Sequence, residues 1–119
     1  MKLILISTLS FLLSSFHKED GVLVIFENDT QKDFKSLTVN IVGKDYTFQN
    51  IPAGKRTDSI RVAKTYKYCM AKAITQSDTL ICVPFDYVGE TLYTRGKFLL
   101  KLTTPGNGKY MNIECENLK

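Results

Sequence analysis

Residues 46–55 read Tyr46-Thr47-Phe48-Gln49-Asn50-Ile51-Pro52-Ala53-Gly54-Lys55 and combine the clearest strand pattern with the clearest turn pattern of the chain. Tyr46 and Phe48 are two residues apart, so a pleated strand directs both rings to one face. Pro52 presets φ at the first turn position, and Gly54 suits the last position of a type I turn that begins at Ile51. The stretch therefore predicts a strand that ends where the chain reverses.

Two segments that precede this stretch also have strand patterns. Gly21 to Asn28 is a continuous apolar run rich in β-branched residues. It predicts a central strand, or one whose outer face is covered. Residues 37–42 alternate in the way a half-buried strand does, and Gly43-Lys44-Asp45 connects them tightly to the strand that contains Tyr46. These two strands are expected to form a hairpin.

A second hairpin is predicted around the polar loop Thr75-Gln76-Ser77-Asp78. If this four-residue loop sets the register, Ile74 lies opposite Thr79 and Met70 lies opposite Val83. One face of the hairpin then collects Tyr68, Met70, Ile81, Val83 and Phe85. We expect this apolar face to form part of the core.

The last hairpin is predicted around a loop rich in glycine and proline, Thr104 to Lys109. Apolar residues alternate on both sides of it, with Phe98, Leu100 and Leu102 before the loop and Met111, Ile113 and Cys115 after it. About seven or eight short strands, with turn signals roughly every ten residues and no helix pattern, are typical of a sandwich. The sequence therefore predicts an all-β fold, a single antiparallel β-sandwich over residues 18–119.

The N-terminus has the shape of a secretory signal. Lys2 is followed by an uncharged and mostly apolar run from Leu3 to Phe16. As a helix this run would span only about 21 Å, short of the ~30 Å hydrocarbon core, so we expect no permanent membrane span. We assign residues 1–17 to a signal peptide that is cleaved between positions 14 and 20, and we expect a secreted or periplasmic protein of the cell envelope.

The motif formed by Tyr46-Thr47-Phe48 and Asn50-Ile51-Pro52-Ala53-Gly54 resembles the Y-x-F-x-x-[IL]-P-x-G turn of carboxypeptidase-regulatory-like and collagen-adhesin-B-type domains. Those domains are small immunoglobulin-like or transthyretin-like sandwiches appended to exported proteins. The resemblance covers about ten residues and is structural. It implies a non-catalytic module and assigns no site residues.

Groups that could carry catalysis are sparse. The only histidine, His17, lies at the leader boundary, which argues against histidine-activated nucleophiles and histidine metal clusters. Glu27, Asn28, Asp29 and Asp33 could offer oxygens to calcium, but they lack the alternating ligands and the glycine of a calcium loop. We therefore expect no catalytic residues, no metal and no cofactor.

The three cysteines are Cys69, Cys82 and Cys115. In the predicted register Cys69 and Cys82 share a face but lie diagonally, at about 7–8 Å between Cα atoms, which is too far for a disulfide. A slip of two residues would place them opposite each other, and a disulfide would then close the hairpin. The alternative, two small buried apolar side chains, is slightly favoured, and Cys115 is expected to be a buried free thiol.

Lys64, Tyr66, Tyr68 and Lys72 alternate along one predicted strand. Tyrosine offers a flat apolar face and a polar tip, so these four residues are a candidate platform for a sugar or an acidic chain. The alternative is that these residues have a structural role. The predicted register favours this alternative, because it places Tyr68 in the core.

The formal net charge of +4 is a mild basic excess, which favours acidic surfaces or, more simply, a lysine-rich solvated surface. We interpret the chain as an exported, non-enzymatic β-sandwich that acts as a binding or structural module at the cell envelope. Its expected partner is an unidentified protein or an anionic envelope polymer, and an exported protein is not expected to bind nucleic acid. The alternative is an inhibitor or accessory subunit of a secreted enzyme, with the loop from Thr104 to Lys109 entering a cleft.

Overall fold

The computed structural model describes residues 21–84, 87, 89–106 and 108–119. The predicted signal peptide lies outside these residues, as does Phe85. The strands are β1 (Gly21–Asn28), β2 (Phe34–Ile41), β3 (Lys44–Ile51), β4 (Ile60–Val62), β5 (Met70–Ile74), β6 (Thr79–Cys82), β7 (Arg95–Thr103) and β8 (Asn112–Asn117). Within the described part of the chain, no helix is long and apolar enough to cross a membrane.

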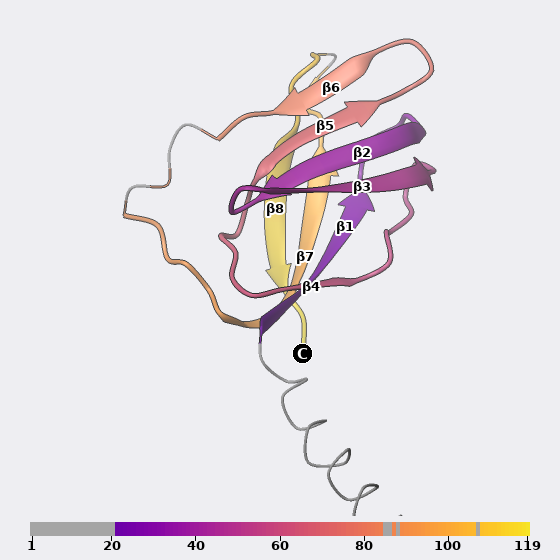
Figure 1. The fold of residues 1–119 in the computed structure, drawn as a ribbon. Helices are drawn as coiled ribbons and strands as arrows, with labels where there is room; N and C mark the ends of the chain where they lie inside the picture. The colour runs from indigo at the N-terminus through magenta and orange to yellow at the C-terminus, as the bar shows by residue number, and fades with distance from the viewer. Residues whose placement is uncertain (1–20, 85–86, 88, 107) are drawn as a thin grey trace, which may run out of the picture.

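The eight strands form two four-stranded sheets that pack face to face (Figure 1). The first sheet has the order β4-β1-β7-β8, and the second has the order β3-β2-β5-β6. This arrangement confirms the predicted all-β sandwich and its number of strands. It also confirms that β1 is a central strand, because β1 lies between β4 and β7.

The pairing of β1 with β7 corrects the prediction of an antiparallel sandwich. These two strands run parallel over eight residue pairs, from Gly21 opposite Arg95 to Asn28 opposite Leu102. The other strand pairs are antiparallel. Parallel neighbours require a long crossover, and here the whole second sheet lies between β1 and β7 in the sequence. A local apolar pattern does not show in which direction a distant strand runs, so this pairing could not be read from either segment alone.

The predicted hairpin of β2 and β3 is confirmed, but its connection lies one residue earlier than expected. Lys44 already pairs with Ile41, so Val42 and Gly43 form a two-residue loop. Both loop residues have positive φ, 48° for Val42 and 84° for Gly43, which is the geometry of a type I′ turn. A β-branched residue is strained at such a φ.

The predicted register of β5 and β6 is confirmed, because Ile74 pairs with Thr79. The choice of face is wrong. Met70 and Val83 are 52% and 59% exposed, and the residues that face the core are Cys69, Ala71, Ala73, Leu80 and Cys82. The physical reason is that alternation along a strand assigns residues to two faces but does not show which face is buried. On β5 the opposite sheet packs on the alanines, and the larger Met70 and Ile74 lie outside.

The turn after β3 differs from the predicted type I turn over residues 51–54. The closing hydrogen bond, 3.0 Å long, runs from the Lys55 amide to the Pro52 carbonyl, so the turn begins one residue later. Gly54 then occupies the third position with a φ of 82°, as a type II turn requires. Beyond this turn the chain crosses to the first sheet, where β4 pairs with β1.

The core lies between the two sheets. Tyr46 and Phe48 are half-buried and both pack against it, which confirms that they share a face. The ring centroids of Phe48 and the buried Phe26 of the first sheet are 5.8 Å apart. Met111 is buried, and Ile113 and Cys115 pack against the core as predicted.

Candidate binding surfaces

Four connections meet at one end of the sandwich, which we call the loop end. They are the β1–β2, β3–β4, β5–β6 and β7–β8 connections, residues 29–33, 52–59, 75–78 and 104–111. Hydrogen bonds and a shared pocket join them, as described below. The loop end is therefore where the two sheets present irregular chain to solvent.

Asn28 organises the loop end, although its side chain is only 1% exposed. Its amide nitrogen donates hydrogen bonds to the carbonyls of Lys32 (2.7 Å) and Ile51 (2.9 Å). Its side-chain oxygen accepts hydrogen bonds from the amide (3.1 Å) and the hydroxyl (2.6 Å) of Thr30. One buried side chain thus fixes the β1–β2 connection and holds it to the end of β3.

Further polar contacts tie the neighbouring connections together. The Asp33 carboxylate accepts a hydrogen bond of 2.9 Å from the Ala53 amide. The buried hydroxyl of Thr75 accepts one of 2.9 Å from the Asp78 amide and so braces the β5–β6 turn. Lys32 forms an ion pair with Asp78. This hydrogen-bonded ammonium group lowers the pKa of the Asp78 carboxyl.

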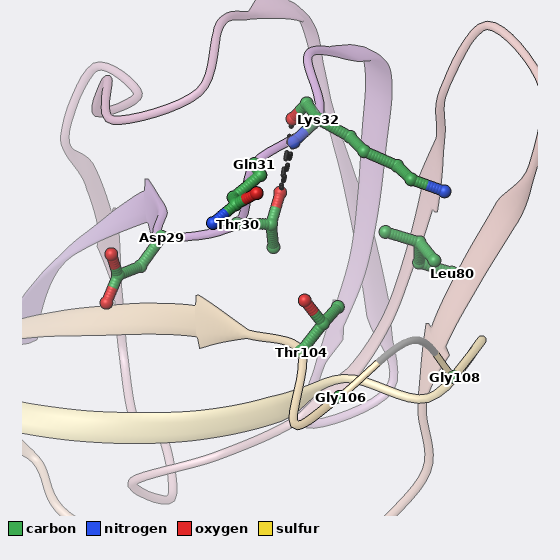
Figure 2. Close-up of a pocket in the computed structure, with 8 residues that line it drawn as sticks. All are labelled: Asp29, Thr30, Gln31, Lys32, Leu80, Thr104, Gly106 and Gly108. Carbon is green, nitrogen blue, oxygen red and sulfur yellow. Dashed lines mark hydrogen bonds between the residues drawn. The ribbon is translucent and has the colours of Figure 1, made fainter.

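A pocket of about 560 Å³ opens between these connections (Figure 2). It is lined by Asp29, Thr30, Gln31, Lys32, Leu80, Thr104, Gly106 and Gly108. In Figure 2 the Thr104 side chain faces Thr30 across the pocket, and Leu80 lies on the opposite side from Asp29. Lys32 extends along the rim toward β5 and β6. The volume is within the range of about 300–1,000 Å³ that small-molecule sites occupy.

The pocket lining is mostly polar. Its described side chains offer a carboxylate, an ammonium group, an amide and hydroxyl groups. Among the residues whose structure is described, no group of three or more histidine, cysteine, aspartate or glutamate side chains could hold a metal ion. Two of the three carboxylates considered for calcium have other partners: Glu27 accepts a hydrogen bond of 2.9 Å from Arg56, and Asp33 accepts one from the Ala53 amide.

The structure brings two residues of the predicted platform together. Tyr66 and Tyr68 are half-buried, and both pack on Tyr87, with ring centroids 4.2 Å and 5.3 Å apart. The Tyr66 and Tyr87 rings are stacked, with an interplanar angle of 17°. The expectation that Tyr68 lies in the core between the sheets is wrong, because Tyr68 lines a small pocket that also contains Asn40 and Gly43.

Within the described part of the chain, no cation–π contact joins the two lysines of the predicted platform to this tyrosine cluster. Lys64 is exposed, and Lys72 is exposed on β5, opposite Thr38 of β2. A lysine that sequence reasoning did not select, Lys67, lies 5.2 Å from the centroid of the Tyr93 ring. The platform is therefore a tyrosine cluster with separate lysines around it.

Cys69, Cys82 and Cys115 are free thiols in the structure. Cys69 and Cys82 are buried, whereas Cys115 is half-buried and not fully buried as predicted. Cys69 precedes β5, and Cys82 pairs with Ala71, so the two thiols are diagonal neighbours on the inner face. Burial, together with the nearby Cys82, raises the pKa of Cys69 to about 12. Burial also raises the pKa of Cys82 and Cys115. The raised pKa values favour the protonated form of these thiols at neutral pH.

Sequence reasoning missed three features of these surfaces: the hydrogen-bonding role of Asn28, the third ring Tyr87 and the loop-end pocket. A signal existed for Asn28, because Asn28-Asp29-Thr30 directly follows a buried strand, where an asparagine side chain can bond the backbone two residues on. No local pattern connects Tyr87 with Tyr66. The pocket needs two connections and strand β6, which are far apart in the sequence.

Comparisons with known proteins give a fold and no family. No family model matches the chain, and no curated protein matches it. A solved structure that is similar is the NMR structure of a protein from Eubacterium rectale, with a TM-score of 0.57 and 18% sequence identity. The match covers 81% of this chain and 89% of that chain. At this identity the likeness supports the all-β fold alone.

Proposed function

We propose that this protein is an exported, non-enzymatic binding module of the cell envelope that holds its ligand in the loop-end pocket. The observation that carries the proposal is the pocket itself, a concave polar site whose β1–β2 wall is held by hydrogen bonds in the absence of a ligand. A site that is already ordered loses less conformational entropy on binding than a mobile loop does.

Two sides of the pocket have their own support. Asn28 holds Thr30 and Lys32, the neighbours of Asp29 and Gln31, through three hydrogen bonds, and a fourth joins it to Ile51. The ion pair between Lys32 and Asp78 links that wall to the β5–β6 turn. Leu80, on the side of the pocket opposite Asp29, is 2% exposed and is the apolar residue of the lining.

The lining favours an uncharged, hydroxyl-rich ligand, such as a sugar unit of an envelope glycan. Asp29 accepts hydrogen bonds, Gln31 both donates and accepts them, and the Thr104 hydroxyl does the same. A sugar ring presents hydroxyl groups at its edge and C–H groups on its face, which match these side chains and Leu80. The positive charge of Lys32 is engaged by Asp78, so the pocket has little attraction for an anionic polymer.

The strand order supports the transthyretin-like type of sandwich over the immunoglobulin-like type. In immunoglobulin constant domains the first two strands lie in the same sheet. Here β1 and β2 belong to different sheets. Such sandwiches serve as appended modules of exported proteins, as the motif at residues 46–54 implies.

The inhibitor or accessory-subunit role is the second candidate, and one observation favours it. Tyr110, at the end of the β7–β8 connection, is 67% exposed, and Pro105 and Lys109 are exposed beside it. An exposed loop that carries an aromatic ring could enter the cleft of an enzyme.

Co-sedimentation of the purified domain with cell-envelope and cell-wall fractions at low and high salt tests the proposal. We expect binding that resists salt, because hydrogen bonds and apolar contact carry it and screening weakens only charge attraction. Thr104→Trp, which fills the pocket, should abolish the binding. Thr91→Trp, an exposed position on the β6–β7 connection at the other end, is the matched control and should bind normally.

Binding that disappears with salt, or that survives Thr104→Trp, would contradict the pocket as the site. No binding at either salt concentration would favour the inhibitor or accessory-subunit role. Thermal unfolding of both variants checks that the fold is kept.

A further inference from the structure

Exposed apolar side chains gather on the outer face of the second sheet. The large hydrophobic residues that are exposed in the described chain are Val42, Met70, Ile74, Val83, Leu92 and Tyr110. Met70 and Ile74 alternate on the outer face of β5, and Val83 continues the outer face of β6 beside Met70. Tyr110 is joined to this face by a bridge to Ile81. We call Met70, Ile74, Ile81, Val83 and Tyr110, with Lys72 among them, the β5–β6 face.

The tyrosine cluster adjoins this face. Tyr68 lines the same small pocket as Asn40 and Val42. Asn40 pairs with Met70, which places that pocket beside the first residue of β5. Tyrosine and methionine are enriched in protein interfaces, so this surface has the composition of a docking site. Monomeric proteins seldom leave a continuous apolar patch uncovered without a function.

Lys72 lies in the middle of the apolar residues. It pairs with Ile81 across the hairpin, and Met70 and Ile74 flank it on its own strand. Across the part of the chain that the structure covers, the ion pairs are Lys32 with Asp78, Arg56 with Glu27 and Lys101 with Glu116, so none involves Lys72. Two acidic residues lie near this face, and both have partners. Asp45 on β3 accepts a hydrogen bond from Asn40, and Asp78, which lines a pocket with Ile74 and Ile81, is paired with Lys32. The β5–β6 face thus offers the positive charge of Lys72 with apolar side chains around it.

We propose that the β5–β6 face docks a protein partner that presents a carboxylate among apolar or aromatic side chains. Charge complementarity selects this occupant, because a glutamate or aspartate would pair with Lys72 while its neighbours cover Met70, Ile74 and Val83. An ion pair that apolar contacts shield from water is stronger than an exposed one.

The same charge argues against a second copy of this chain. A two-fold dimer over this face would bring the two Lys72 side chains close together, and like charges at such a contact oppose association. Addition of a partner strand to β6 is also blocked, because that edge is already paired. Ile81 donates a hydrogen bond of 2.8 Å to the Lys109 carbonyl and accepts one of 2.7 Å from the Met111 amide. The partner therefore covers the face and does not extend the sheet.

This docking surface is independent of the loop-end pocket, since none of its apolar residues, nor Lys72, lines that pocket. An experiment can therefore refute one of the two proposed sites without refuting the other.

A random copolymer of glutamate and tyrosine is a suitable probe, with polyglutamate and a lysine–tyrosine copolymer as controls. Binding is measured by titration calorimetry and mapped by amide shifts in NMR spectra.

We expect the glutamate–tyrosine copolymer to bind and to shift the amide signals of Met70, Lys72 and Ile81, while both control polymers bind at least about ten-fold more weakly. Lys72→Glu should weaken the binding by about ten-fold or more. Ile74→Thr, which keeps the charge and the strand propensity, should weaken it as well. Lys55→Glu makes the same change of charge at the exposed turn after β3, and it should leave the affinity unchanged.

Several results would overturn the proposal. They are no binding of the copolymer, equal binding to Lys72→Glu and to Lys55→Glu, or amide shifts confined to the loop end. A concentration-dependent dimer that Met70→Ser abolishes would assign the face to a second copy. Binding to vesicles of anionic lipid that depends on Lys72 would assign it to a membrane surface.

Discussion

The side-chain amide of Asn28 donates a hydrogen bond of 2.9 Å to the carbonyl of Ile51, across 23 residues of sequence. Asn28 ends β1 in the first sheet, and Ile51 ends β3 in the second. The two sheets are therefore joined by a buried polar contact at the loop end, in addition to the apolar core between them. The geometry of the loop-end pocket depends on this contact.

Asn28→Ala should destabilise the protein strongly. The substitution removes the side-chain amide that donates to the carbonyls of Lys32 and Ile51, and the oxygen that accepts from Thr30. Because buried groups are then left unsatisfied, the free energy of unfolding should fall by roughly 3 kcal/mol. Urea unfolding measures the change. Asn117→Ala, at an exposed edge position, is the control and should change the free energy by less than about 0.5 kcal/mol. Equal effects of the two substitutions would contradict the role of Asn28.

Val42→Asn should stabilise the protein. Val42 has a φ of 48° next to Gly43, and asparagine followed by glycine is the preferred pair in a type I′ turn. Relief of this strain should raise the free energy of unfolding by about 1 kcal/mol. Val42→Thr keeps the branched side chain and should give no gain. An equal gain from threonine would show that the backbone strain is not the cause.

Asp78 should titrate at an acidic pH that depends on Lys32. The ion pair lowers the pKa of the Asp78 carboxyl, so the pair contributes stability above the ordinary pKa and loses it as the pH falls through the lowered value. Carboxyl NMR titration of the wild type should show the low midpoint. Lys32→Met should raise the midpoint toward the ordinary range, whereas Lys35→Met, at a nearby exposed lysine, should leave it unchanged.

Cys69 should make the stability depend on alkaline pH. Burial raises the pKa of its thiol from 9.0 to about 12, so the folded state holds this proton more tightly than the unfolded state does. The stabilisation is complete below the unfolded value of 9.0 and is lost as the pH rises toward 12. We expect the difference in unfolding free energy between wild type and Cys69→Ala to shrink over this interval. A constant difference would contradict the assignment.

Strands and hairpins were predictable because their signals are local. Each of these signals lies within one short segment. They are the alternation of Tyr46 and Phe48, the short loop near Gly43 and the polar loop before Thr79. The inner face of β5 was not predictable from these signals, since Met70 and Ala71 alternate equally well in either orientation. Only the position of the opposite sheet decides that Ala71 is buried and Met70 exposed.

Features that join distant segments could not be predicted from the sequence. The parallel pairing of β1 with β7 follows from the path of the whole chain between them. The turn at Gly54 shifted by one residue because Asn28 supplies the acceptor: the Gly54 amide donates to the Asn28 carbonyl, at 2.7 Å. The loop-end pocket likewise needs Thr30 and Thr104 to face each other, and they belong to different connections.

NMR shift mapping of the labelled domain with soluble glycan fragments of the envelope tests the proposed binding function most directly. Saturable shifts of the amide signals of Gln31, Thr104 and Gly106, lost in Thr104→Trp and kept in Thr91→Trp, are the result that this function predicts. Shifts that appear only around Tyr66 and Tyr68, or no shifts with any fragment, would contradict the loop-end pocket as a glycan site.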